Sequence, residues 1–552
     1  MKMDMKIKDI LMKDFDVKGD IEINISGVKY DSRDVKSGDL FVAIKGENFD
    51  GHNFIEDAVR RGAVAIVYEQ SAISNQQSAM LMNTYPDIVW IGVGDCRDAV
   101  ASISHNFYRR PSEEAAVIGI TGTNGKTTTS YLIKSILEKW GKGVGLIGTI
   151  TYLIKDAAYD APHTTPESPD FQALLRQMLD AGCSHVVTEV SSHSLSQKRV
   201  DYTKFKVAVF TNLTRDHLDF HQTMEDYFMA KERLFTELLE ENGAAVINAD
   251  DPYGERLAND LKGRGMKILT CAINNRDADI TAFDIKTTFK GTSFRLQTKS
   301  SELQTLNSEL FGSPLVGVTN VYNILSSICA ALSLNIPIKI IKEGIAMTGL
   351  VKGRFEKVDI GQDFLAVVDY AHTEDALERL LMTARQLLEA YRFAEKTEKM
   401  LKTKRQEYSI SEEREVGKII TVFGCGGNRD RGKRSKMGEI AAKLSDFVII
   451  TSDNPRNESP RGIIRDIEKG IEGDNYIVIP DRSVAISMAV ELASSGDIVL
   501  ISGKGHEAYQ EIQGRRYDFS DRTALENAIR RSIGRPSFGG GTDYKGTENI
   551  RC

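Results

Sequence analysis

From residue 115 onwards, short apolar segments alternate with segments of helical periodicity. Four apolar runs, each ending in polar or glycine residues, are expected to be strands of one sheet: 115–121, 185–190, 207–212 and 244–249. Such alternation is typical of a parallel sheet whose strands are joined by crossover helices. Ligands bind at the carboxyl ends of the strands in sheets of this kind. The pattern therefore predicts an α/β fold with functional side chains at those strand ends.

A second alternating region begins near Gly353. Its expected strands are 364–370, 418–423, 447–451, 476–479 and 497–502. The first part of the chain mixes short strands, such as 38–45 and 62–68, with helices, and 109–112 is a plausible linker.

A chain of 552 residues is too long for one core, so we expect three domains. These are an N-terminal domain (1–110), a central domain with a parallel sheet and a phosphate loop (111–352), and a Rossmann-like C-terminal domain (353–552). Within the last, residues 389–417 are rich in Lys, Arg and Glu and are expected to be a solvated helical hairpin or a loop insertion. The polar, Gly-rich tail 535–552 is expected to be disordered.

Composition restricts the class of protein without naming a function. The hydrophobic content of 41% and charged content of 27% are those of a globular protein, and no apolar run is long enough to span a membrane. We find no secretory signal, and the six cysteines form no CxxC pair, which favours a cytoplasmic protein with reduced thiols. A net charge of −7 argues against nucleic acid as a partner. We expect a monomer that acts on small molecules.

A glycine-rich loop, GITGTNGKTTT at 119–129, joins the first central strand to a helix. In nucleoside triphosphate loops, glycines let backbone N–H groups approach phosphate oxygens; here Lys126 would reach the β- and γ-phosphates and Thr127 would ligate Mg²⁺. The strict GxxxxGK spacing is not met, because position 120 is Ile and the nearer glycine is Gly122. The alternative is a Gly-rich turn that arose by chance. The loop alone does not distinguish between a kinase, a GTPase, a motor and a ligase. The predicted ATP-binding loop residues are Gly122, Thr123, Asn124, Gly125, Lys126, Thr127 and Thr128.

Three further residues are candidates for a metal site. Glu189 ends the strand at 185–190, where a carboxylate faces the crevice and suits Mg²⁺. His217 follows the strand at 207–212, and Lys231 lies on an expected helix beyond it. Singly, such a His is usually a structural hydrogen-bond donor and such a Lys a solvated charge. A functional role is favoured for all three because they share the layer of strand ends with the phosphate loop.

The ordered set TGTNGKTTT, EVSSH, FTNLTRDHLDFH and AKERLF resembles the Mur ligases, and the resemblance extends from Asp31 to Glu507. In that family the lysine equivalent to Lys231 is carbamylated, which turns a cation into an anionic metal ligand. The resemblance implies four catalytic residues, Lys126, Glu189, His217 and Lys231. It also implies a Mg²⁺ site formed by Thr127, Glu189, His217 and carbamylated Lys231.

The resemblance further implies residues for the nucleotide-sugar and for ATP. The former are Ser32, Thr164, Thr165, Ser191, Gln197 and Arg199, whose hydroxyls, amide and guanidinium suit a substrate with phosphates and carboxylates. In the DSR motif, a turn capped by Asp-Ser is the alternative for Ser32. The ATP residues outside the loop are Asn320, Asn323, Arg354 and His372, and helix capping is the alternative for Asn320.

Three polar loops of the last domain each follow an apolar strand and are expected to form an amino-acid pocket. A pocket for meso-2,6-diaminopimelate needs an Arg clamp for a carboxylate and an acceptor for the distal ammonium. Arg429 and Arg456 supply the first, and Glu507 with the carbonyl of Gly503 supplies the second. The DNPR motif is the family's form associated with diaminopimelate; its residues are Asp453, Asn454, Pro455 and Arg456. Alternatively, Arg456 pairs with a surface acid.

The resemblance implies an ATP-dependent ligase of peptidoglycan precursor synthesis that adds meso-diaminopimelate to UDP-N-acetylmuramoyl-L-alanyl-D-glutamate through an acyl phosphate. ATP is the co-substrate and Mg²⁺ the cofactor. Alternatives in the same class are addition of L-lysine, of D-glutamate or of a dipeptide, or extension of folate with glutamate. An alternative from another class is an ATPase that hydrolyses ATP to switch conformation.

Overall fold

The computed structural model describes residues 4–46, 49–299, 306–403 and 417–534. The chain divides into two compact units, Met1–Val351 and Lys352–Cys552, which are described separately. The proposed disordered tail 535–552 lies outside the described residues, as does the part of the 389–417 segment from 404 to 416.

The first unit begins with a five-stranded sheet of order β2-β7-β6-β5-β4. The strands are β2 Asp16–Lys18, β4 Gly27–Lys29, β5 Asp39–Val42, β6 Ala65–Glu69 and β7 Val89–Val93. Helix α3 (Cys96–Phe107) packs on one face. Helices α1 (Ile55–Arg60) and α2 (Asn75–Thr84) pack on the other.

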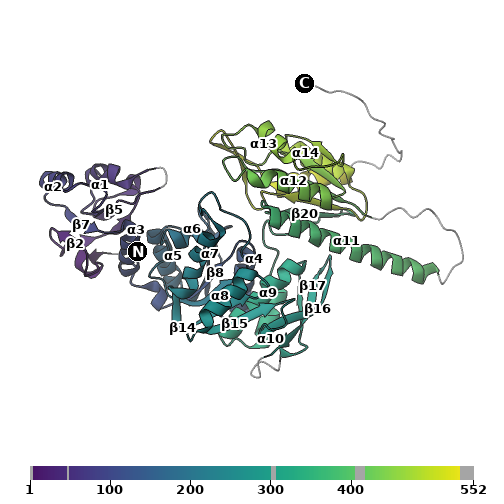
Figure 1. Ribbon diagram of the computed structural model, residues 1–552, viewed down its shortest axis with the longest axis horizontal. Helices are drawn as coiled ribbons and strands as arrows, with labels where there is room; N and C mark the ends of the chain where they lie inside the picture. The colour runs from purple at the N-terminus through teal and green to yellow at the C-terminus, as the bar shows by residue number, and fades with distance from the viewer. Residues whose placement is uncertain (1–3, 47–48, 300–305, 404–416, 535–552) are drawn as a thin grey trace. The chain divides into compact units, whose positions relative to one another are not determined.

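The second sheet of this unit has eleven strands in the order β11-β10-β9-β12-β8-β13-β14-β15-β16-β17-β18. Strands β8, β14, β15, β16 and β17 are labelled in Figure 1. The eleven strands are β8 Ala116–Thr121, β9 Val144–Ile147, β10 Tyr152–Ile154, β11 Ala157–Tyr159, β12 His185–Glu189, β13 Phe205–Phe210, β14 Leu239–Asn248, β15 Lys267–Ala272, β16 Ile280–Thr288, β17 Gly291–Thr298 and β18 Leu310–Ser313. The strands from β9 to β16 pair in parallel. Both edges are antiparallel hairpins, which the sequence analysis did not predict.

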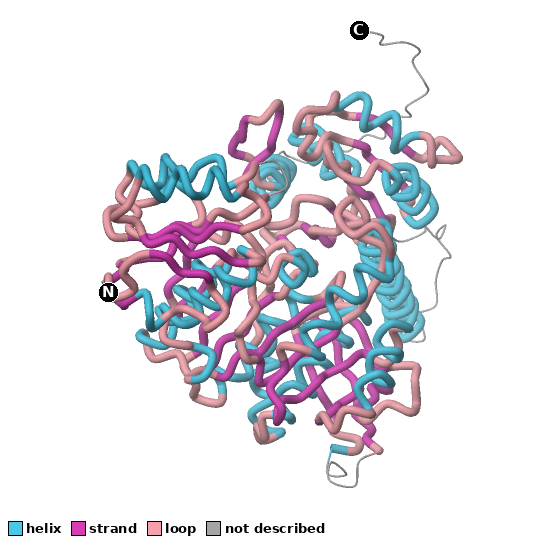
Figure 2. The backbone as a smooth tube through the Cα atoms, turned by 60° about the vertical axis from the view of Figure 1, so that its left-hand side comes forward, coloured by secondary structure: helices cyan, strands magenta, loops and turns pink. Residues whose placement is uncertain are grey.

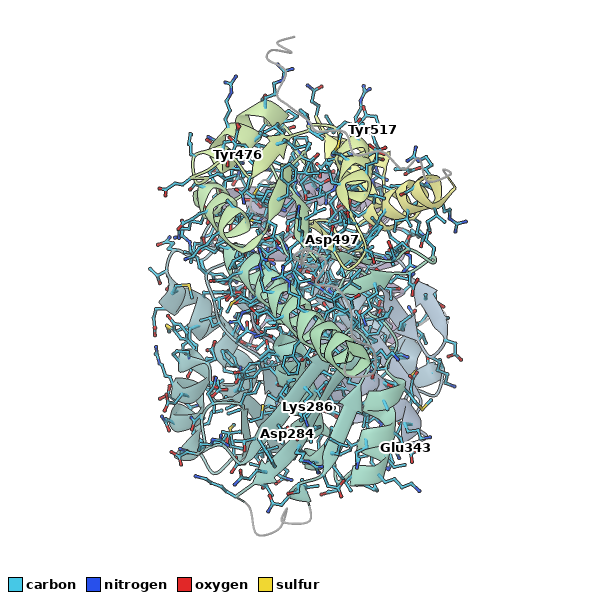
Figure 3. All side chains as sticks on the ribbon, turned by 90° about the vertical axis from the view of Figure 1, so that its right-hand side faces the viewer. Asp284, Lys286, Glu343, Tyr476, Asp497 and Tyr517 are labelled. Atoms are coloured by element: carbon cyan, nitrogen blue, oxygen red, sulfur yellow. The ribbon has the colours of Figure 1, made fainter. Side chains whose placement is uncertain are left out.

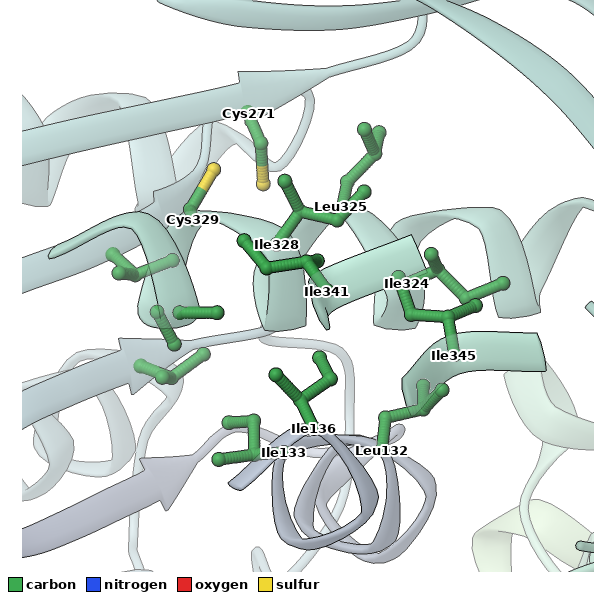
Figure 4. Close-up of a cluster of buried hydrophobic side chains, with 14 of the residues drawn as sticks. Leu132, Ile133, Ile136, Cys271, Ile324, Leu325, Ile328, Cys329, Ile341 and Ile345 are labelled. Carbon is green, nitrogen blue, oxygen red and sulfur yellow. The ribbon is translucent and has the colours of Figure 1, made fainter. Parts of the chain in front are cut away.

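Helices cover both faces of this sheet (Figure 2). Helices α4 (Lys126–Lys139), α9 (Val318–Ser333) and α10 (Ile338–Met347) share one hydrophobic core with it. In that core, Ile133 and Ile136 of α4 meet Ile328 and Ile341 (Figure 4). Helices α5 (Ser168–Asp180), α7 (Met224–Thr236) and α8 (Pro252–Lys262) pack on the other face.

The far end of strand β16 is part of the protein surface. Burial alternates along its second half, as expected for a strand with one solvated face. Asp284 and Lys286 form an exposed ion pair there (Figure 3).

The second unit is built on a six-stranded sheet of order β19-β20-β24-β21-β22-β23, parallel except for β19. Its strands are β19 Glu356–Val358, β20 Leu365–Asp369, β21 Ile419–Phe423, β22 Phe447–Ile450, β23 Tyr476–Val478 and β24 Ile498–Ser502. Its helices are α11 Glu374–Thr403, α12 Gly432–Leu444, α13 Pro460–Glu468, α14 Arg482–Leu492 and α15 Asp521–Ile533. A hairpin, β25 Tyr509–Ile512 with β26 Arg515–Asp518, follows β24. Residues 389–403 continue α11 without a turn.

Among the described residues, no helix has both the length and the apolar character needed to cross a bilayer. The predicted strands of both sheets are confirmed to within a few residues. The strand expected at 207–212 ends instead at Phe210. Thr211 and Asn212 leave it because the Thr211 hydroxyl and the Asn212 side chain and carbonyl bond to the glycine-rich loop.

Candidate functional site

The glycine-rich loop runs from the end of β8 to the start of α4. Gly122 has a φ of 142° and Gly125 a φ of 89°, backbone conformations that side chains disfavour. A Cβ on Gly122 would overlap Thr211 Oγ1, and one on Gly125 would overlap Asn323 Oδ1. The two glycines are therefore required by both conformation and space.

The loop is held by the residues that follow β13. The N–H of Thr123 donates to the Asn212 carbonyl at 2.9 Å, and the N–H of Asn124 donates to Asn212 Oδ1 at 2.9 Å. Thr211 Oγ1 donates to the Asn124 carbonyl at 2.6 Å. The loop is thus shaped before any ligand arrives. Lys126 Nζ donates hydrogen bonds to two carbonyl groups of the loop, that of Gly122 at 2.8 Å and that of Thr123 at 2.9 Å.

Asn320 and Asn323 lie near the start of α9, as predicted. Asn323 Nδ2 donates to Asn320 Oδ1 at 3.0 Å, and Thr129 Oγ1 donates to Asn323 Oδ1 at 3.4 Å. The capping alternative for Asn320 is wrong, because the N-cap is Gly317 and the Asn320 amide donates to the Val316 carbonyl. Asn323 therefore borders the glycine-rich loop.

Glu189 is buried at the end of β12, the strand beside β8. Its carboxylate accepts three hydrogen bonds. Thr127 Oγ1 donates to Oε2 at 3.0 Å, and Thr149 donates through its N–H to Oε1 at 2.9 Å and through its Oγ1 to Oε2 at 3.0 Å. Because the hydroxyl proton of Thr127 points to Glu189, the lone pairs of its oxygen are directed away from that carboxylate.

Lys231 lies inside the unit on α7 and is buried. Its Nζ donates to the Gly122 carbonyl at 3.1 Å and lies 4.5 Å from the centre of the Tyr227 ring. Burial, reinforced by the charge of nearby Lys126, holds the pKa of Lys231 well below its usual range. The ordinary alternative, a solvated lysine, is wrong for this residue.

His217 belongs to a cluster of rings beside Lys231. Its ring stands edge-on to that of His193, with centres 4.9 Å apart, and 6.0 Å from the ring of Tyr227. The backbone of His217 is left-handed, with a φ of 54°. Burial lowers the pKa of His193 to about 4, so this ring is neutral at pH 7.

No group of three or more His, Cys, Asp or Glu side chains within the described ranges is arranged to hold a metal ion. The chemistry of the donors nevertheless fits Mg²⁺, a cation that prefers oxygen ligands. Glu189 and Thr127 supply oxygens, and an uncharged Lys231 amine is the form that reacts with carbon dioxide to give a carbamate.

The predicted nucleotide-sugar residues of the central domain lie beside Glu189. Thr165 Oγ1 donates to the Glu189 carbonyl at 2.8 Å and accepts from the Ser191 N–H at 3.1 Å. Thr164 Oγ1 lies 3.1 Å from Thr149 Oγ1. Arg199 bonds to the Gln197 side chain and the Thr165 carbonyl and pairs with Glu167 at 2.9 Å.

Ser32 lies in a pocket of about 360 Å³. It begins a 3₁₀ turn for which the Asp31 side chain accepts a hydrogen bond from the Arg33 N–H, so the turn-capping alternative describes Asp31 correctly. Most of the lining was not predictable from the sequence; it includes Tyr30, Phe41, Phe49, Phe54, Arg97 and Glu167. The pairing of Tyr30 OH with Asp170 Oδ2 at 2.8 Å joins this domain to α5.

In the second unit, the loops after β21, β22 and β24 converge. A Cβ on Gly503 would lie 2.6 Å from Asp453 Oδ2, and one on Gly426 would lie 3.0 Å from Arg456 Nη1 and 3.9 Å from Arg429 Cγ. The predicted amino-acid residues are therefore brought together at one edge of the sheet.

Arg456 adopts a left-handed conformation with a φ of 50° after Pro455. Its Nη1 donates to the Gly427 carbonyl at 2.7 Å, and its Nε lies 3.4 Å from Glu511 Oε2. Pairing with an acid, the alternative raised from the sequence, is thus present, although the arginine is only about a fifth exposed.

Glu507 is tied to Asn454 through Lys504, which the sequence analysis did not single out. Lys504 is buried and donates to Glu507 Oε2 at 2.9 Å and to Asn454 Oδ1 at 3.0 Å. Asn454 Nδ2 donates to the same Glu507 oxygen at 2.8 Å. The three side chains hold one another in a fixed orientation.

Arg354 and His372 gather around Tyr370. The Arg354 guanidinium lies 4.7 Å from the centre of the Tyr370 ring, and the His372 ring centre lies 4.5 Å from it. Lys433, also missed from sequence, donates to the His372 carbonyl at 2.8 Å. Arg354, Tyr370 and His372 therefore lie together in the second unit, with Lys433 bonded to the His372 backbone.

Three family models match this chain: Mur ligase family, catalytic domain (24–108), Mur ligase middle domain (120–331) and Mur ligase, glutamate ligase domain (394–505). A protein of Clostridioides difficile named UDP-N-acetylmuramoyl-L-alanyl-D-glutamate--2,6-diaminopimelate ligase is 42% identical over 95% of this chain and 99% of its own. A protein of the same name from Aquifex aeolicus is 42% identical over 92% of this chain and 94% of its own.

Solved structures agree with these relatives. A structure of a UDP-N-acetylmuramoyl-L-alanyl-D-glutamate--2,6-diaminopimelate ligase matches with a TM-score of 0.63 and 30% identity, covering 97% of this chain and 100% of the other. MurF ligase of Thermotoga maritima in complex with ADP shares the fold, with a TM-score of 0.58 and 19% identity over 92% of this chain and 97% of its own. The three family models and the relatives that are 42% identical over most of their length show that the chain belongs to the Mur ligase family.

Proposed function

We propose that this protein is the ligase that adds meso-2,6-diaminopimelate to UDP-N-acetylmuramoyl-L-alanyl-D-glutamate, with ATP, in peptidoglycan precursor synthesis. The observation that carries the proposal is one sheet edge on which the phosphate loop, Glu189 and the acceptor residues Thr164 and Thr165 lie side by side. Relatives that are 42% identical over most of their length bear the name of this enzyme.

In the proposed reaction, the side-chain carboxylate of D-glutamate attacks the γ-phosphorus of ATP, which gives an acyl phosphate and ADP. The amine of diaminopimelate then attacks the acyl carbon, phosphate leaves and a proton is lost, which completes the amide. Both first-step reactants are anions, so the loop amides and Lys126 are needed to offset their repulsion. Asn320, Asn323, Arg354 and His372 are proposed to bind the nucleotide.

Thr127, Glu189, His217 and carbamylated Lys231 are proposed to hold Mg²⁺, which would supply positive charge beside the phosphates when bound. The support is chemical. Glu189 and Thr127 offer oxygen atoms, and burial keeps the Lys231 amine uncharged and able to form a carbamate. The carbamate carries a negative charge, which the low-dielectric interior tolerates only beside a cation.

The nucleotide-sugar is proposed to enter the pocket at Ser32. Aromatic walls formed by Phe41, Phe49 and Phe54 suit a nucleobase. Its peptide end would reach Thr164, Thr165, Ser191, Gln197 and Arg199. Because Arg199 already pairs with Glu167, we propose that the substrate carboxylate competes for this guanidinium.

Diaminopimelate is proposed to bind the converging loops of the second unit, at Arg429, Asp453, Asn454, Pro455, Arg456, Gly503 and Glu507. Arg456 would exchange Glu511 for the distal carboxylate of the ligand. L-lysine lacks that carboxylate, and the alternative of a lysine-adding enzyme therefore gives Arg456 no partner in the substrate. We further propose a cytoplasmic monomer with domains at 1–110, 111–352 and 353–552.

The test of this function is phosphate release from ATP by the full-length protein. We expect release that requires both UDP-N-acetylmuramoyl-L-alanyl-D-glutamate and diaminopimelate, with formation of the tripeptide product. L-lysine in place of diaminopimelate should give a much lower rate. Phosphate release that is indifferent to both substrates would instead identify a switch ATPase.

Replacing Arg456 with alanine tests the amino-acid site. The loss of a charge-assisted, bidentate contact is expected to raise the KM for diaminopimelate on the order of 10- to 100-fold. The KM values for ATP and for the nucleotide-sugar should stay within about twofold. Arg431→Ala is the matched control, because Arg431 is 72% exposed and forms a surface pair with Glu458. Equal effects of the two variants on all three KM values would refute the role of Arg456.

A further inference from the structure

We propose that Thr149 is a positioning residue that holds Glu189 in place and sets the hydrogen-bond direction of Thr164. The inference rests on the proposed function and adds a residue to it. Thr149 contacts both the side chain expected at the metal and a side chain expected at the acceptor substrate. It therefore links two parts of the reaction site.

The position of Thr149 follows from the sheet order. It comes two residues after β9, and β9 pairs in parallel with β12, with Ile147 opposite Thr188. The intervening residue is Gly148, where a Cβ would overlap Glu189 Oε1. The absence of a side chain at 148 lets the backbone of Thr149 reach the carboxylate.

Both polar groups of Thr149 are directed at the same carboxylate. Its N–H donates to Glu189 Oε1 at 2.9 Å, and its Oγ1 donates to Oε2 at 3.0 Å. Two bonds to two oxygens fix the plane of the carboxylate as well as its position. Thr127 Oγ1 donates to Oε2 from the other side, at 3.0 Å.

The direction of the bond between the two threonines is then determined. A hydroxyl has one proton, and a carboxylate can only accept, so the Thr149 proton goes to Glu189. The 3.1 Å contact between Thr149 Oγ1 and Thr164 Oγ1 must therefore be donated by Thr164. Thr164 is left with lone pairs, and it presents an acceptor to N–H or O–H groups of the substrate.

Substitution by valine removes this arrangement without changing the shape of the side chain. Thr149→Val keeps the backbone bond to Oε1 but deletes the bond to Oε2 and the acceptor for Thr164. Thr149→Ser keeps both. Thr151→Val is the matched control, because the Thr151 hydroxyl donates to the Tyr159 carbonyl at 2.7 Å and lies in the same segment.

The experiment measures three quantities for each full-length variant: the calorimetric Kd of UDP-N-acetylmuramoyl-L-alanyl-D-glutamate without nucleotide or metal, the Mg²⁺ concentration at half-maximal ligation, and the melting temperature. For Thr149→Val we expect a Kd and a Mg²⁺ midpoint each raised about tenfold, the effect of one lost polar contact. The melting temperature should stay within a few degrees. Thr149→Ser should recover most of both losses, and Thr151→Val should match the wild type.

Unchanged Kd and Mg²⁺ midpoint in Thr149→Val would overturn the inference, and so would a serine variant as impaired as the valine variant. A drop in melting temperature with both binding constants unchanged would assign Thr149 to the fold alone and would also overturn it. Wild-type protein that makes no tripeptide would refute the proposed function itself, and the inference with it. If the wild type forms the tripeptide and Thr149→Val leaves both the Kd and the Mg²⁺ midpoint unchanged, only the inference would be refuted.

Discussion

Lys231→Ala is expected to abolish ligation, with a fall in kcat on the order of a thousandfold or more. The wild-type amine is buried, 3.1 Å from the Gly122 carbonyl oxygen, and its pKa is held well below the usual range. An uncharged amine at neutral pH combines with carbon dioxide to form a carbamate and a proton. Alanine would delete the proposed anionic group beside the glycine-rich loop.

The lowered pKa of Lys231 determines how stability and carbamate formation depend on pH. Because the folded pKa is below the unfolded one, the amine stays uncharged until the pH falls through the folded value. Burial of Lys231 therefore costs stability when the pH is below the unfolded pKa. Carbamate formation is expected to be lost on acidification through the folded pKa, because protonated amine does not react with carbon dioxide.

Chemical rescue separates this role from a structural one. Acetate or formate should restore part of the Lys231→Ala activity by placing a carboxylate where the carbamate stood, and NMR with isotopically labelled carbon dioxide should detect the carbamate in the wild type alone. Lys139→Ala is the control, because Lys139 forms a surface pair with Glu343 on the neighbouring helix and should be dispensable. Full activity in Lys231→Ala would remove the carbamate from the mechanism.

Gly122→Ala is expected to weaken ATP binding on the order of a hundredfold. The residue has a φ of 142°, and its Cβ would overlap Thr211 Oγ1 and lie 3.0 Å from the Asn212 carbonyl oxygen. The loop must shift to relieve the overlap. A shift moves the Gly122 carbonyl that holds both Lys126 and Lys231.

The measurement is calorimetric titration with a non-hydrolysable ATP analogue, together with the melting temperature. Gly312→Ala is the control, because a Cβ there would have no heavy atom of the described residues within 4 Å apart from its chain neighbours. It should bind the analogue as the wild type does. If Gly122→Ala bound equally well, the loop would not be the phosphate site.

Local patterns in the sequence were sufficient to predict four of the eleven strands of the central sheet and five of the six strands of the last sheet, with the residues at their ends. Side-chain periodicity is set by backbone geometry within one element, so it is visible without knowledge of the partner strands. The glycine-rich loop was predictable for the same reason, since strand, loop and helix are consecutive. Glu189 was found because it ends a strand, and His217 and Lys231 gained their roles from the family resemblance.

Contacts between distant segments were not predictable from such patterns. Thr149 and Glu189 are 40 residues apart, and they meet only because β9 lies beside β12. Lys504 and Asn454, 50 residues apart, meet because the loops after β22 and β24 converge. The pocket at Ser32 likewise brings Phe41 of strand β5 together with Glu167, the N-cap residue of α5.

The sequence by itself determined the alternation of elements, the residues at the strand ends and the chemical types available there. The tertiary structure alone decided which of those residues are neighbours, that Lys231 is buried and that both sheet edges of the central domain are antiparallel. The physical reason is that strand order and burial depend on the packing free energy of the whole domain, whereas periodicity depends on the geometry of a single helix or strand.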